Sequence, residues 1–593
     1  MNINKLKWNI LLALSFSFFS LQGVHGQTKS ALSENFEELP DPTADVESDW
    51  SKVPAGLNSS FVTIDKRFAK SLVPEVASQN RVRIEGWKGE KLSAQILLWT
   101  KAEISNVTVH VSDLVSKNQE VIPSSEASAR FVRYVMTDEF AEGCGHRKPE
   151  DFASSLSPDM LDNLQSFNIP AETSRPVWLS VKVPENAPSG VFIGIVTING
   201  KDIESQKLAL ELEVINQVLP KAKDWRFHLD QWQHPSAVAR VEGLEMWSDA
   251  HFEALKPVMK MLADAGQKVI TTTLNKDPWN VQTFDPYADM ITWVKNEDNS
   301  WTYDYTVFDR WVQFMTDLGV DDMINCYSII PWNNEIHYKD SSKDEVVNVV
   351  AKPGTKIFEE LWTPFLEDFV KHLQSKGWLE KTNIAMDERE REQMDAAFAL
   401  LTKVAPEIGI SYADNQKTYQ RFPNSEDISI SVGDPFDKQD LIDRRNRGLN
   451  STFYICCADA FPNQFTFSEP AESTYLGWYA LATGFDGMLR WAFNSWVENP
   501  LQDSRFRTWP AGDTYIVYPK GRSSIRYERM LEGVQDYEKA RIVLEMLKEK
   551  NDQKNLQAFQ TAISKLENNT RFAGWNEQLN EAKKLMNEIS KSL

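Results

Sequence analysis

The chain has 593 residues but only four cysteines, so disulfide bonds cannot form the framework of its fold. It contains neither GxGxxG nor GxxxxGK[ST], the glycine-rich sequences that cradle phosphates, which argues against nucleotide binding. It has no GxSxG elbow to support a Ser–His–Asp triad. It lacks HExxH, the eight histidines are scattered, and Cys456 and Cys457 have no CxxC companion. We therefore expect neither a metal site nor a cofactor.

The charge balance excludes another class of partner. The chain has 64 basic and 85 acidic residues, a formal net charge of −21, and such a surface repels a phosphate backbone. We therefore expect no nucleic-acid partner. Hydrophobic residues make up 42% and charged residues 25%, which is typical of globular proteins. The 20 tryptophans suit the apolar faces of sugar rings, but large cores also hold many tryptophans, and composition alone favours the core.

The first 26 residues are typical of an export signal. Lys5 and Lys7 precede an apolar run over residues 10–21, and Val24-His25-Gly26 supplies a cleavage site before Gln27. We expect residues 1–26 to be a signal peptide and the mature protein to be periplasmic or secreted. No cysteine lies near the cleavage point, which argues against a lipid anchor, and no later stretch approaches the length of a membrane span. Residues 27–48 are interpreted as an acidic, solvated lead-in.

The rest of the chain divides into three regions. Residues 49–220 contain short runs that alternate with period two, such as PVWLSVKV at 176–183, and predict a β-sandwich. Residues 221–520 alternate strand-like and helical runs and predict a (β/α)₈ barrel, in which the helix between the fifth and sixth strands is short. Residues 521–593 show helical spacing and predict a C-terminal helical region. The eight strand-like runs of the barrel cover residues 226–232, 268–275, 322–330, 382–388, 409–415, 427–434, 452–459 and 486–493.

In such a barrel, chemistry is placed at the carboxyl ends of the strands. The fourth strand ends in Asp387 and Glu388, and two carboxylates there favour acid/base catalysis. Neighbours in a regular strand point to opposite faces, so the chain must bend or bulge if both are to face the pocket. The competing interpretation is a solvated acidic loop that pairs with Arg389 and Arg391. At the end of an apolar barrel strand, the active-site interpretation is favoured.

Other strand ends supply aromatic, amide and acidic groups. This mixture suits a sugar, because rings cover its apolar faces while carboxylates and amides bind its hydroxyls. Any single one of these residues could equally belong to the core, and the argument depends on their convergence at one face of the barrel. The candidate substrate-binding residues from the strand ends are Trp232, His234, Asn275, Lys276, Trp332, Tyr412, Asp414, Asn415, Asp459, Trp491, Asn494 and Trp496.

Two stretches of the sequence resemble a known family. The block over residues 489–540, LRWAFNSWVENPLQDSRFRTWPAGDTYIVYPKGRSSIRYERMLEGVQDYEKA, and the strand end AMDERE resemble glycoside hydrolase family 123. That resemblance implies an exported β-N-acetylgalactosaminidase with an N-terminal β-sandwich, a barrel and a C-terminal helical region. Asp513 of this block joins the substrate-binding candidates.

The resemblance also implies a mechanism. A family member releases terminal β-linked N-acetylgalactosamine with retention, and the acetamido group of the substrate acts as nucleophile through an oxazolinium ion. Glu388 would be the general acid and then the base, while Asp387 would orient the acetamido group and stabilise its developing charge. Two adjacent carboxylates agree with these roles, since like charges so close raise one pKa and keep Glu388 protonated.

Two alternatives remain open. A glycosidase of another class could use Glu388 as acid and a carboxylate on another strand, such as Asp459, as nucleophile. A non-catalytic glycan-binding protein could instead use the tryptophan-rich face. The terminal sugar could belong to a glycolipid, a glycoprotein or a free oligosaccharide, of which glycolipid-type oligosaccharides are the expected substrates. The sequence predicts no oligomeric state.

Overall fold

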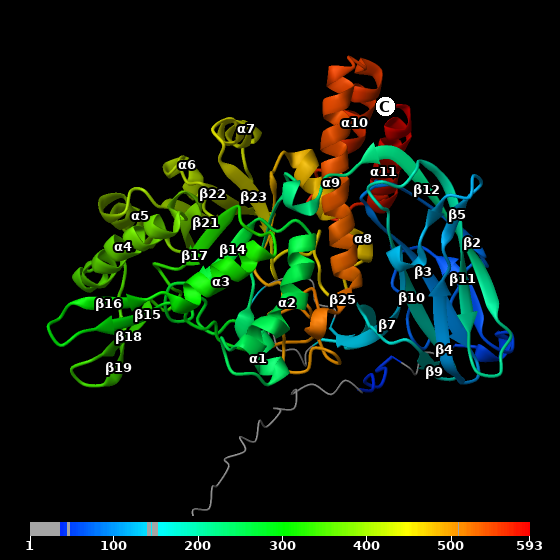
Figure 1. Cartoon of the computed structure of the whole chain (residues 1–593), viewed down its shortest axis with the longest axis horizontal. Helices are drawn as coiled ribbons and strands as arrows, with labels where there is room; N and C mark the ends of the chain where they lie inside the picture. Colours follow the sequence, from blue (N-terminus) through cyan, green and yellow to red (C-terminus); the bar gives the residue numbers. More distant parts are fainter. Residues whose placement is uncertain (1–35, 44–47, 139–143, 145–151, 508) are drawn as a thin grey trace, which may run out of the picture.

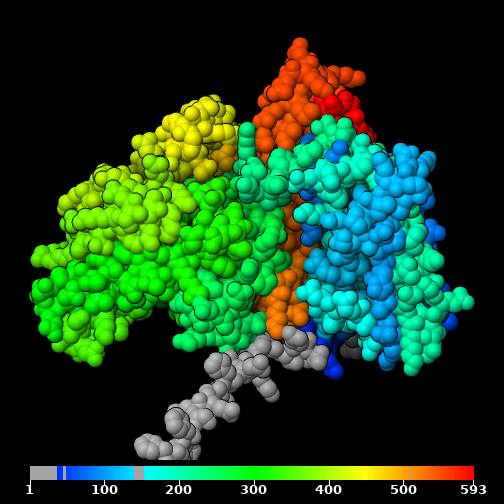
Figure 2. Space-filling model, in the orientation of Figure 1, coloured from blue at the N-terminus to red at the C-terminus, as the bar shows by residue number. Residues whose placement is uncertain are grey.

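The computed structural model describes the chain except residues 1–35, 44–47, 139–143, 145–151 and 508. The expected signal peptide, residues 1–26, lies outside the described residues. A region of β-sheet lies on one side of the molecule and a barrel of strands and helices on the other (Figure 1). In the space-filling view, the C-terminal part of the chain, coloured orange to red, is seen between the green barrel and the blue β-sheet region and projects above them (Figure 2). Within the described residues, no helix is both long and apolar enough to cross a membrane.

Two sheets form the N-terminal region, as the period-two runs predict. The first has the order β1 (Asn58–Val62), β3 (Lys91–Thr100), β10 (Thr173–Lys182), β7 (Ala127–Thr137), β8 (Ser155–Leu161) and β25 (Ser523–Ser524). The second has the order β2 (Arg81–Lys88), β12 (Gln206–Val218), β11 (Gly190–Asn199), β4 (Ile104–Val111) and β9 (Phe167–Ile169), with β5 (Leu114–Ser116) paired to β11 and β6 (Val121–Ile122) paired to β5. Leu208, Leu210, Leu212 and Val214 alternate into one apolar core that both sheets line. This alternation is the physical basis of the sandwich.

Strand β25 ties the sandwich to the rest of the chain. It pairs with β8 through Ser523 and Leu161, although the two strands are far apart in sequence. Just beyond it, the buried Arg526 guanidinium pairs with the Asp159 carboxylate at 2.9 Å. The sandwich therefore packs against the later part of the chain through a shared sheet and a buried ion pair.

All eight predicted barrel strands are present and parallel. Their order is β13 (His228–Gln231), β24 (Gly487–Arg490), β23 (Asn450–Ile455), β22 (Asp427–Ser431), β21 (Gly409–Asp414), β20 (Thr382–Met386), β17 (Met323–Tyr327) and β14 (Val269–Thr273). The two ends of this sheet approach each other, and the Lys268 amide donates to the Leu229 carbonyl at 2.9 Å. The sheet is therefore a nearly closed barrel.

Helices cover the barrel where the sequence predicts them. They are α1 (Pro235–Glu242), α2 (Asp249–Asp264), α3 (Thr306–Asp317), α4 (Lys356–Lys376), α5 (Arg391–Val404), α6 (Thr418–Arg421), α7 (Lys438–Asn446) and α8 (Pro470–Thr483). In α2, the Ser248 hydroxyl caps the first turn, and Phe252, Leu255, Met259 and Leu262 are buried. Gly266 follows with a φ of +86°, a conformation that side chains with a Cβ rarely adopt. The four-residue α6 explains why the fifth unit has a weak helical signal.

The structure also contains a small four-stranded sheet that the sequence did not predict. It has the order β16 (Trp301–Asp304), β15 (Thr292–Lys295), β18 (Glu335–Asp340) and β19 (Glu345–Val350). Its strands come from the connections that follow β14 and β17. They are only four to six residues long and partly exposed, so they have little apolar alternation to detect.

The C-terminal region is helical, as predicted, with α9 (Ile525–Glu549), α10 (Gln553–Ser564) and α11 (Trp575–Ser592). Most of α9 is buried, including charged residues such as Glu528 and Lys539. It lies between the barrel and the sandwich and also contacts α8, α10 and α11 (Figure 1). These contacts explain why α9 is buried over most of its length.

The lead-in region differs from expectation at Glu38, whose side chain is only 5% exposed. Its carboxylate accepts hydrogen bonds from Arg175 at 2.5 and 2.9 Å and from Arg133 at 3.2 Å, and pairs with Lys70 at 2.8 Å. Burial alone would raise the pKa of Glu38, but these cations outweigh it and hold the pKa well below its usual value. Residues near the N-terminal end of the described chain therefore neutralise cations of the sandwich.

Replacing Glu38 by Gln should destabilise the protein by about 3–5 kcal/mol, because it leaves buried cations without their counter-charge. Because folding lowers the pKa of Glu38, its stabilisation is present at neutral pH and is lost as the pH falls below about 4.5. Urea unfolding at several pH values measures both effects. The exposed neighbour Glu37, changed to Gln, is the control. Equal unfolding midpoints for the two variants would contradict the assignment.

Candidate active site

A cavity of about 160 Å³ opens at the carboxyl ends of the barrel strands. This is the end of a parallel barrel at which catalytic groups are placed. Four tryptophans and a tyrosine contribute most of its aromatic surface. Its described lining consists of Cys144, Trp232, Gln282, Trp332, Asp387, Glu388, Ala413, Tyr454, Cys456, Cys457, Leu489, Trp491 and Trp509.

Asp387 and Glu388 both line this cavity. Strand β20 ends at Met386, so the two residues lie in a bend beyond the regular strand, which agrees with the expected change of backbone direction. The Asp387 carboxylate accepts the Trp332 indole N–H at 3.0 Å on one oxygen and the Glu388 amide at 2.8 Å on the other. These two donors hold the Asp387 carboxylate in one orientation.

The pair is not a solvated loop neutralised by arginine. Arg389 donates to the Trp332 carbonyl at 3.0 Å and to Asn334 at 3.2 Å, and its guanidinium lies 5.4 Å from the centre of the Trp332 ring. Arg391 pairs instead with Asp395 at 3.9 Å. Arg389 thus braces the tryptophan that orients Asp387.

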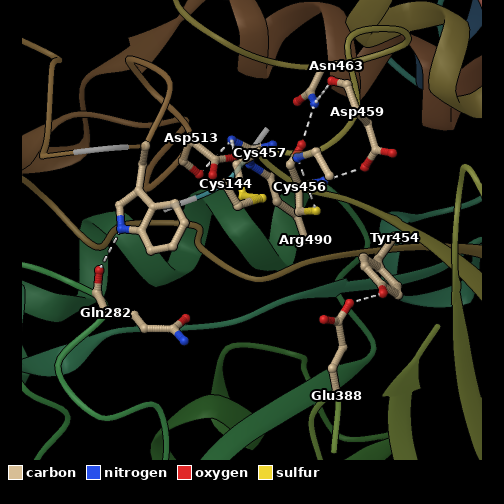
Figure 3. Close-up of a disulfide and its surroundings, with 12 residues drawn as sticks. Cys144, Gln282, Glu388, Tyr454, Cys456, Cys457, Asp459, Asn463, Arg490 and Asp513 are labelled. Atoms are coloured by element: carbon tan, nitrogen blue, oxygen red, sulfur yellow. Dashed lines mark hydrogen bonds and ion pairs between the residues drawn. A yellow bond between two sulfur atoms is a disulfide. The ribbon is translucent and has the colours of Figure 1, made fainter. Parts of the chain in front are cut away.

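Burial sets the protonation of Glu388. It raises the pKa of this carboxyl to about 7, and the nearby Asp387 charge adds to the rise. The Tyr454 hydroxyl donates a hydrogen bond to Glu388 and acts in the opposite direction (Figure 3). The pKa of Asp387 is also raised by burial, while its hydrogen bond from Trp332 opposes the rise. Glu388 can therefore both give and take a proton near neutral pH.

Aromatic side chains contribute much of the lining of the cavity and pack on further rings behind it. Trp232 packs against Trp279 and Tyr327, with ring centres 4.7 Å apart in both cases. Trp491 and Trp509 meet edge to face at 6.0 Å, and the Trp509 indole donates to the Gln282 carbonyl at 3.1 Å. Such a surface with two carboxyl groups at one side suits a sugar ring.

Three of the predicted substrate-binding residues, Trp232, Trp332 and Trp491, line the cavity together with the carboxyl pair. Asp414, Asp459 and Asp513 lie close to it but outside its described lining. Asp414 accepts the Thr418 amide at 2.5 Å, and Asp459 accepts the Cys456 amide at 2.9 Å. Asp513 is fully buried, 3.6 Å from the Arg490 guanidinium.

The remaining seven candidates lie outside the described lining of the cavity. Asn275 accepts the His337 amide at 2.9 Å and donates to the His337 carbonyl at 3.0 Å, and Asn415 is exposed. His234 stacks on Tyr287 at 3.7 Å, and burial lowers its pKa to about 3, so it is neutral. Asn494 accepts the His234 amide at 2.9 Å and donates to its carbonyl at 3.0 Å. Lys276 pairs with Glu335 of β18.

Tyr412 and Trp496, the last two of these candidates, are core residues by position. Tyr412 packs edge to face on Phe398 of α5, with ring centres 6.0 Å apart. Trp496 is 1% exposed, and its indole donates to the Val517 carbonyl at 2.7 Å. Both rings belong to the packing that surrounds the barrel.

Several residues that line the cavity were not predicted from the sequence. Tyr454 and Cys456 are two positions apart at the end of β23, so the period of a strand places them on the same side, and this signal could have identified Tyr454. Trp509 lies in the block that resembles the family, but nothing local marks it. Gln282 and Cys144 lie in long connections and reach the cavity only through tertiary structure.

Cys144 and Cys457 form a disulfide, with 5.3 Å between their Cα atoms (Figure 3). Cys456 is free, and its sulfur lies within 4.8 Å of the other two. Three thiolates so close could hold a soft metal ion, but the disulfide leaves only one of them available. The sequence did not predict this pairing, because residues 144 and 457 are 313 positions apart.

Comparison with known proteins identifies the architecture. Residues 232–543 match the family model described as glycoside hydrolase 123, catalytic domain, and residues 61–200 match the glycoside hydrolase 123 N-terminal domain. The chain is similar to a family 123 glycoside hydrolase from Clostridium perfringens, studied for the details of glycolipid glycan hydrolysis. That match has 27% identity and a TM-score of 0.81, and it covers 90% of this chain and 97% of the other.

A second structural match is too weak to indicate a shared fold. It is a xyloglucanase of family 5 from Bacteroides ovatus, with 8% identity and a TM-score of 0.27, covering 80% of this chain and 100% of the other. A comparison with curated proteins found no match. The family models and the Clostridium perfringens structure agree with the sandwich and the barrel described above.

Proposed function

This chain belongs to glycoside hydrolase family 123, and from that premise we propose that it is an exo-acting, retaining β-N-acetylgalactosaminidase. It would release terminal β-linked N-acetylgalactosamine by substrate-assisted catalysis through an oxazolinium ion. Glycolipid-type oligosaccharides are the proposed substrates, since glycolipid glycan hydrolysis was studied in the Clostridium perfringens relative. We also propose that the protein is exported through residues 1–26.

One observation carries the mechanism. Among the described residues that line the cavity, only the adjacent Asp387 and Glu388 have carboxyl groups. A retaining enzyme with its own nucleophile needs two separated carboxyls that flank the glycosidic bond. Both oxygens of Asp387 already accept hydrogen bonds, which suits a fixed charge better than a nucleophile. The missing nucleophile is then best supplied by the acetamido group of the substrate.

The first step uses Glu388 in its protonated form. Glu388 donates its proton to the leaving-group oxygen, while the acetamido carbonyl oxygen attacks the anomeric carbon. Asp387 accepts a hydrogen bond from the acetamido N–H and balances the positive charge that develops on the oxazolinium. The aromatic surface around Trp232 and Trp491 excludes water from this charge pair, which strengthens it.

The second step reverses the roles. Glu388, now ionised, takes a proton from water, and the water opens the oxazolinium at the anomeric carbon. Two inversions give net retention of configuration. A pKa near 7 allows one carboxyl to serve both steps. The alternative nucleophile, Asp459, accepts the Cys456 amide and does not line the cavity, so the geometry favours it less.

The test of this function is hydrolysis of paired aryl glycosides. The β-N-acetylgalactosaminide should be cleaved at least about tenfold faster, in kcat/KM, than the β-N-acetylglucosaminide. The two sugars differ only in the orientation of one hydroxyl. A site that hydrogen-bonds the axial hydroxyl leaves a buried polar group unpaired when the equatorial isomer binds, which costs about 1–3 kcal/mol. Equal rates would indicate a broad hexosaminidase. Binding of the sugar without any release would indicate the glycan-binding alternative.

Tyr454 gives a prediction on pH dependence. A catalytic acid must be protonated, so kcat/KM should fall as the pH rises through the Glu388 pKa of about 7. Tyr454→Phe removes the hydrogen bond that lowers this pKa, so the falling limb should move to higher pH. The matched control is Tyr305→Phe, which removes a 2.8 Å hydrogen bond to Asp368 outside the cavity. If the falling limb did not move in Tyr454→Phe, the Tyr454 hydroxyl would not influence the pKa of Glu388, and the prediction would be wrong.

A further inference from the structure

The N-terminal sandwich contributes directly to the wall of the catalytic cavity. Cys144 belongs to the connection between β7 and β8, two strands of the sandwich, yet its side chain lines the same cavity as Glu388. Its disulfide partner, Cys457, lies two residues beyond the end of β23, which is a barrel strand. The bond therefore joins two regions of the chain at the sugar site.

Hydrogen bonds place the end of β7 beside the rim of the barrel. The Met136 amide donates to the Gln502 carbonyl at 2.8 Å, and the Ser504 amide donates to the Met136 carbonyl at 2.9 Å. The Ala511 amide donates to the Asp138 carboxylate at 3.1 Å. Residues 502–511 also contain Trp509, another wall of the cavity. The sandwich therefore braces this segment independently of the disulfide.

The disulfide completes that wall. Tyr454, Cys456 and Cys457 follow one another on β23 and just beyond it, and all three line the cavity. Figure 3 shows the Cys144–Cys457 bond beside Cys456, and the Tyr454–Glu388 hydrogen bond in the same view. Fixing Cys457 thus also fixes the strand end that presents Tyr454 to the acid.

The third cysteine does not compete for the bond. Burial and the nearby Asp459 charge raise the pKa of the Cys456 thiol well above its usual value. Only a thiolate attacks a disulfide, so Cys456 is a poor nucleophile although its sulfur lies within 4.8 Å. The cross-link between the sandwich and β23 therefore persists in the oxidised protein.

We infer that the Cys144–Cys457 disulfide is a positioning element of the sugar site, and that its reduction converts the enzyme to a low-affinity state; this inference rests on the proposed glycosidase function. A dithiol reductant supplies the chemistry. One of its thiolates attacks a sulfur of the bond, forms a mixed disulfide and releases one cysteine thiolate, which takes a proton. The second thiol of the reductant closes a cyclic disulfide and releases the other cysteine. Two electrons and two protons pass to the protein.

The experiment compares the full-length oxidised protein with the same protein treated with dithiothreitol, at a temperature well below unfolding. Reduction should raise KM for the aryl β-N-acetylgalactosaminide at least about tenfold, because displacing a positioning group by about 1 Å can cost up to about 10²-fold. The effect on kcat should be smaller, and the falling limb of the pH profile should move to higher pH, as in Tyr454→Phe, because the strand end that presents Tyr454 to Glu388 is no longer fixed. Reoxidation should restore the original KM.

Variants assign the effect to this bond. The double variant Cys144→Ser/Cys457→Ser should behave like the reduced enzyme and should no longer respond to dithiothreitol. Cys326→Ala removes the free thiol buried in β17 and should keep the full response. Alkylation of the unfolded, non-reduced wild-type protein should label two cysteines, and prior reduction should raise this number to four. Four labels without reduction would overturn the inference.

Two further outcomes separate the inference from the proposed function. N-acetylgalactosamine binding, followed by tryptophan fluorescence, reports affinity whether or not turnover occurs. If reduction lowers only the melting temperature and leaves KM and sugar affinity unchanged, the disulfide is merely structural and the inference is wrong. If the oxidised protein binds the sugar in a redox-dependent way but hydrolyses no N-acetyl-β-galactosaminide, the proposed function fails while the positioning role stands.

Discussion

Replacing Glu388 by Gln should lower kcat by about 10²–10⁴-fold on substrates with poor leaving groups, the usual contribution of general acid–base catalysis. Gln cannot donate the proton that the leaving-group oxygen needs. The loss should be smaller for activated aryl glycosides, whose leaving groups need less protonation. The falling limb of the pH profile near pH 7 should also disappear, because that limb reports Glu388. Steady-state kinetics on a series of leaving groups measures both effects.

Asp387→Asn completes this test. It should slow every substrate, regardless of leaving group, because it removes the charge that faces the oxazolinium. The Asp387 charge helps to raise the pKa of Glu388, so its removal should move the falling limb to lower pH, opposite to Tyr454→Phe. Glu390→Gln changes an exposed carboxyl three residues after Asp387 and is the control. Near-normal rates for both site variants on all substrates would contradict the assignment.

Much of the barrel could be predicted because its signals are local. Each strand is a short apolar run, and glycines such as Gly266 and Gly377 end the helices that precede later strands. Because parallel strands end at one mouth, the position of Asp387 and Glu388 at a strand end already implies a shared cavity. Their bend follows from the same reasoning, since two adjacent side chains cannot otherwise face one side.

Residue type alone could not identify the sugar-facing groups. Trp491 and Trp496 are both tryptophans after the same strand, yet one lines the cavity and the other packs in the core. Tyr412 and Tyr454 are tyrosines on barrel strands, and only Tyr454 points to Glu388. Which face a ring occupies depends on strand register and on the neighbours that are packed there, and a single sequence does not record them.

Contacts between residues far apart in the sequence also could not be predicted. Cys144 reaches the cavity because the end of β7 pairs with residues 502–504, which are more than 350 positions away. Glu38 is buried because the sandwich presents Arg133 and Arg175 to it. An acidic stretch without apolar periodicity has no local signal for burial, so its composition indicated solvent exposure.

A β-galactoside with a free hydroxyl in place of the acetamido group should bind but hardly turn over. The acetamido carbonyl is the proposed nucleophile, and holding it beside the anomeric carbon can supply about 7–11 kcal/mol through effective molarity. Asp387 contributes to that alignment, since Trp332 and the Glu388 amide fix its carboxylate. Inhibition by this galactoside, measured against the aryl N-acetylgalactosaminide, should show binding while product release stays near background.

Fluorine substitution tests the same nucleophile without removing it. Replacing the hydrogens of the acetyl methyl group by one, two and three fluorines withdraws electrons from the carbonyl oxygen, so kcat should fall steadily along the series. Binding should change little, because Asp387 contacts the N–H rather than the methyl group. A nucleophile supplied by the protein would give a flat response and a sugar covalently attached to a carboxylate, detectable by mass spectrometry. Asp387 and Asp459 are the residues at which such an adduct would be sought, and its appearance on either would replace substrate assistance by a covalent glycosyl-enzyme.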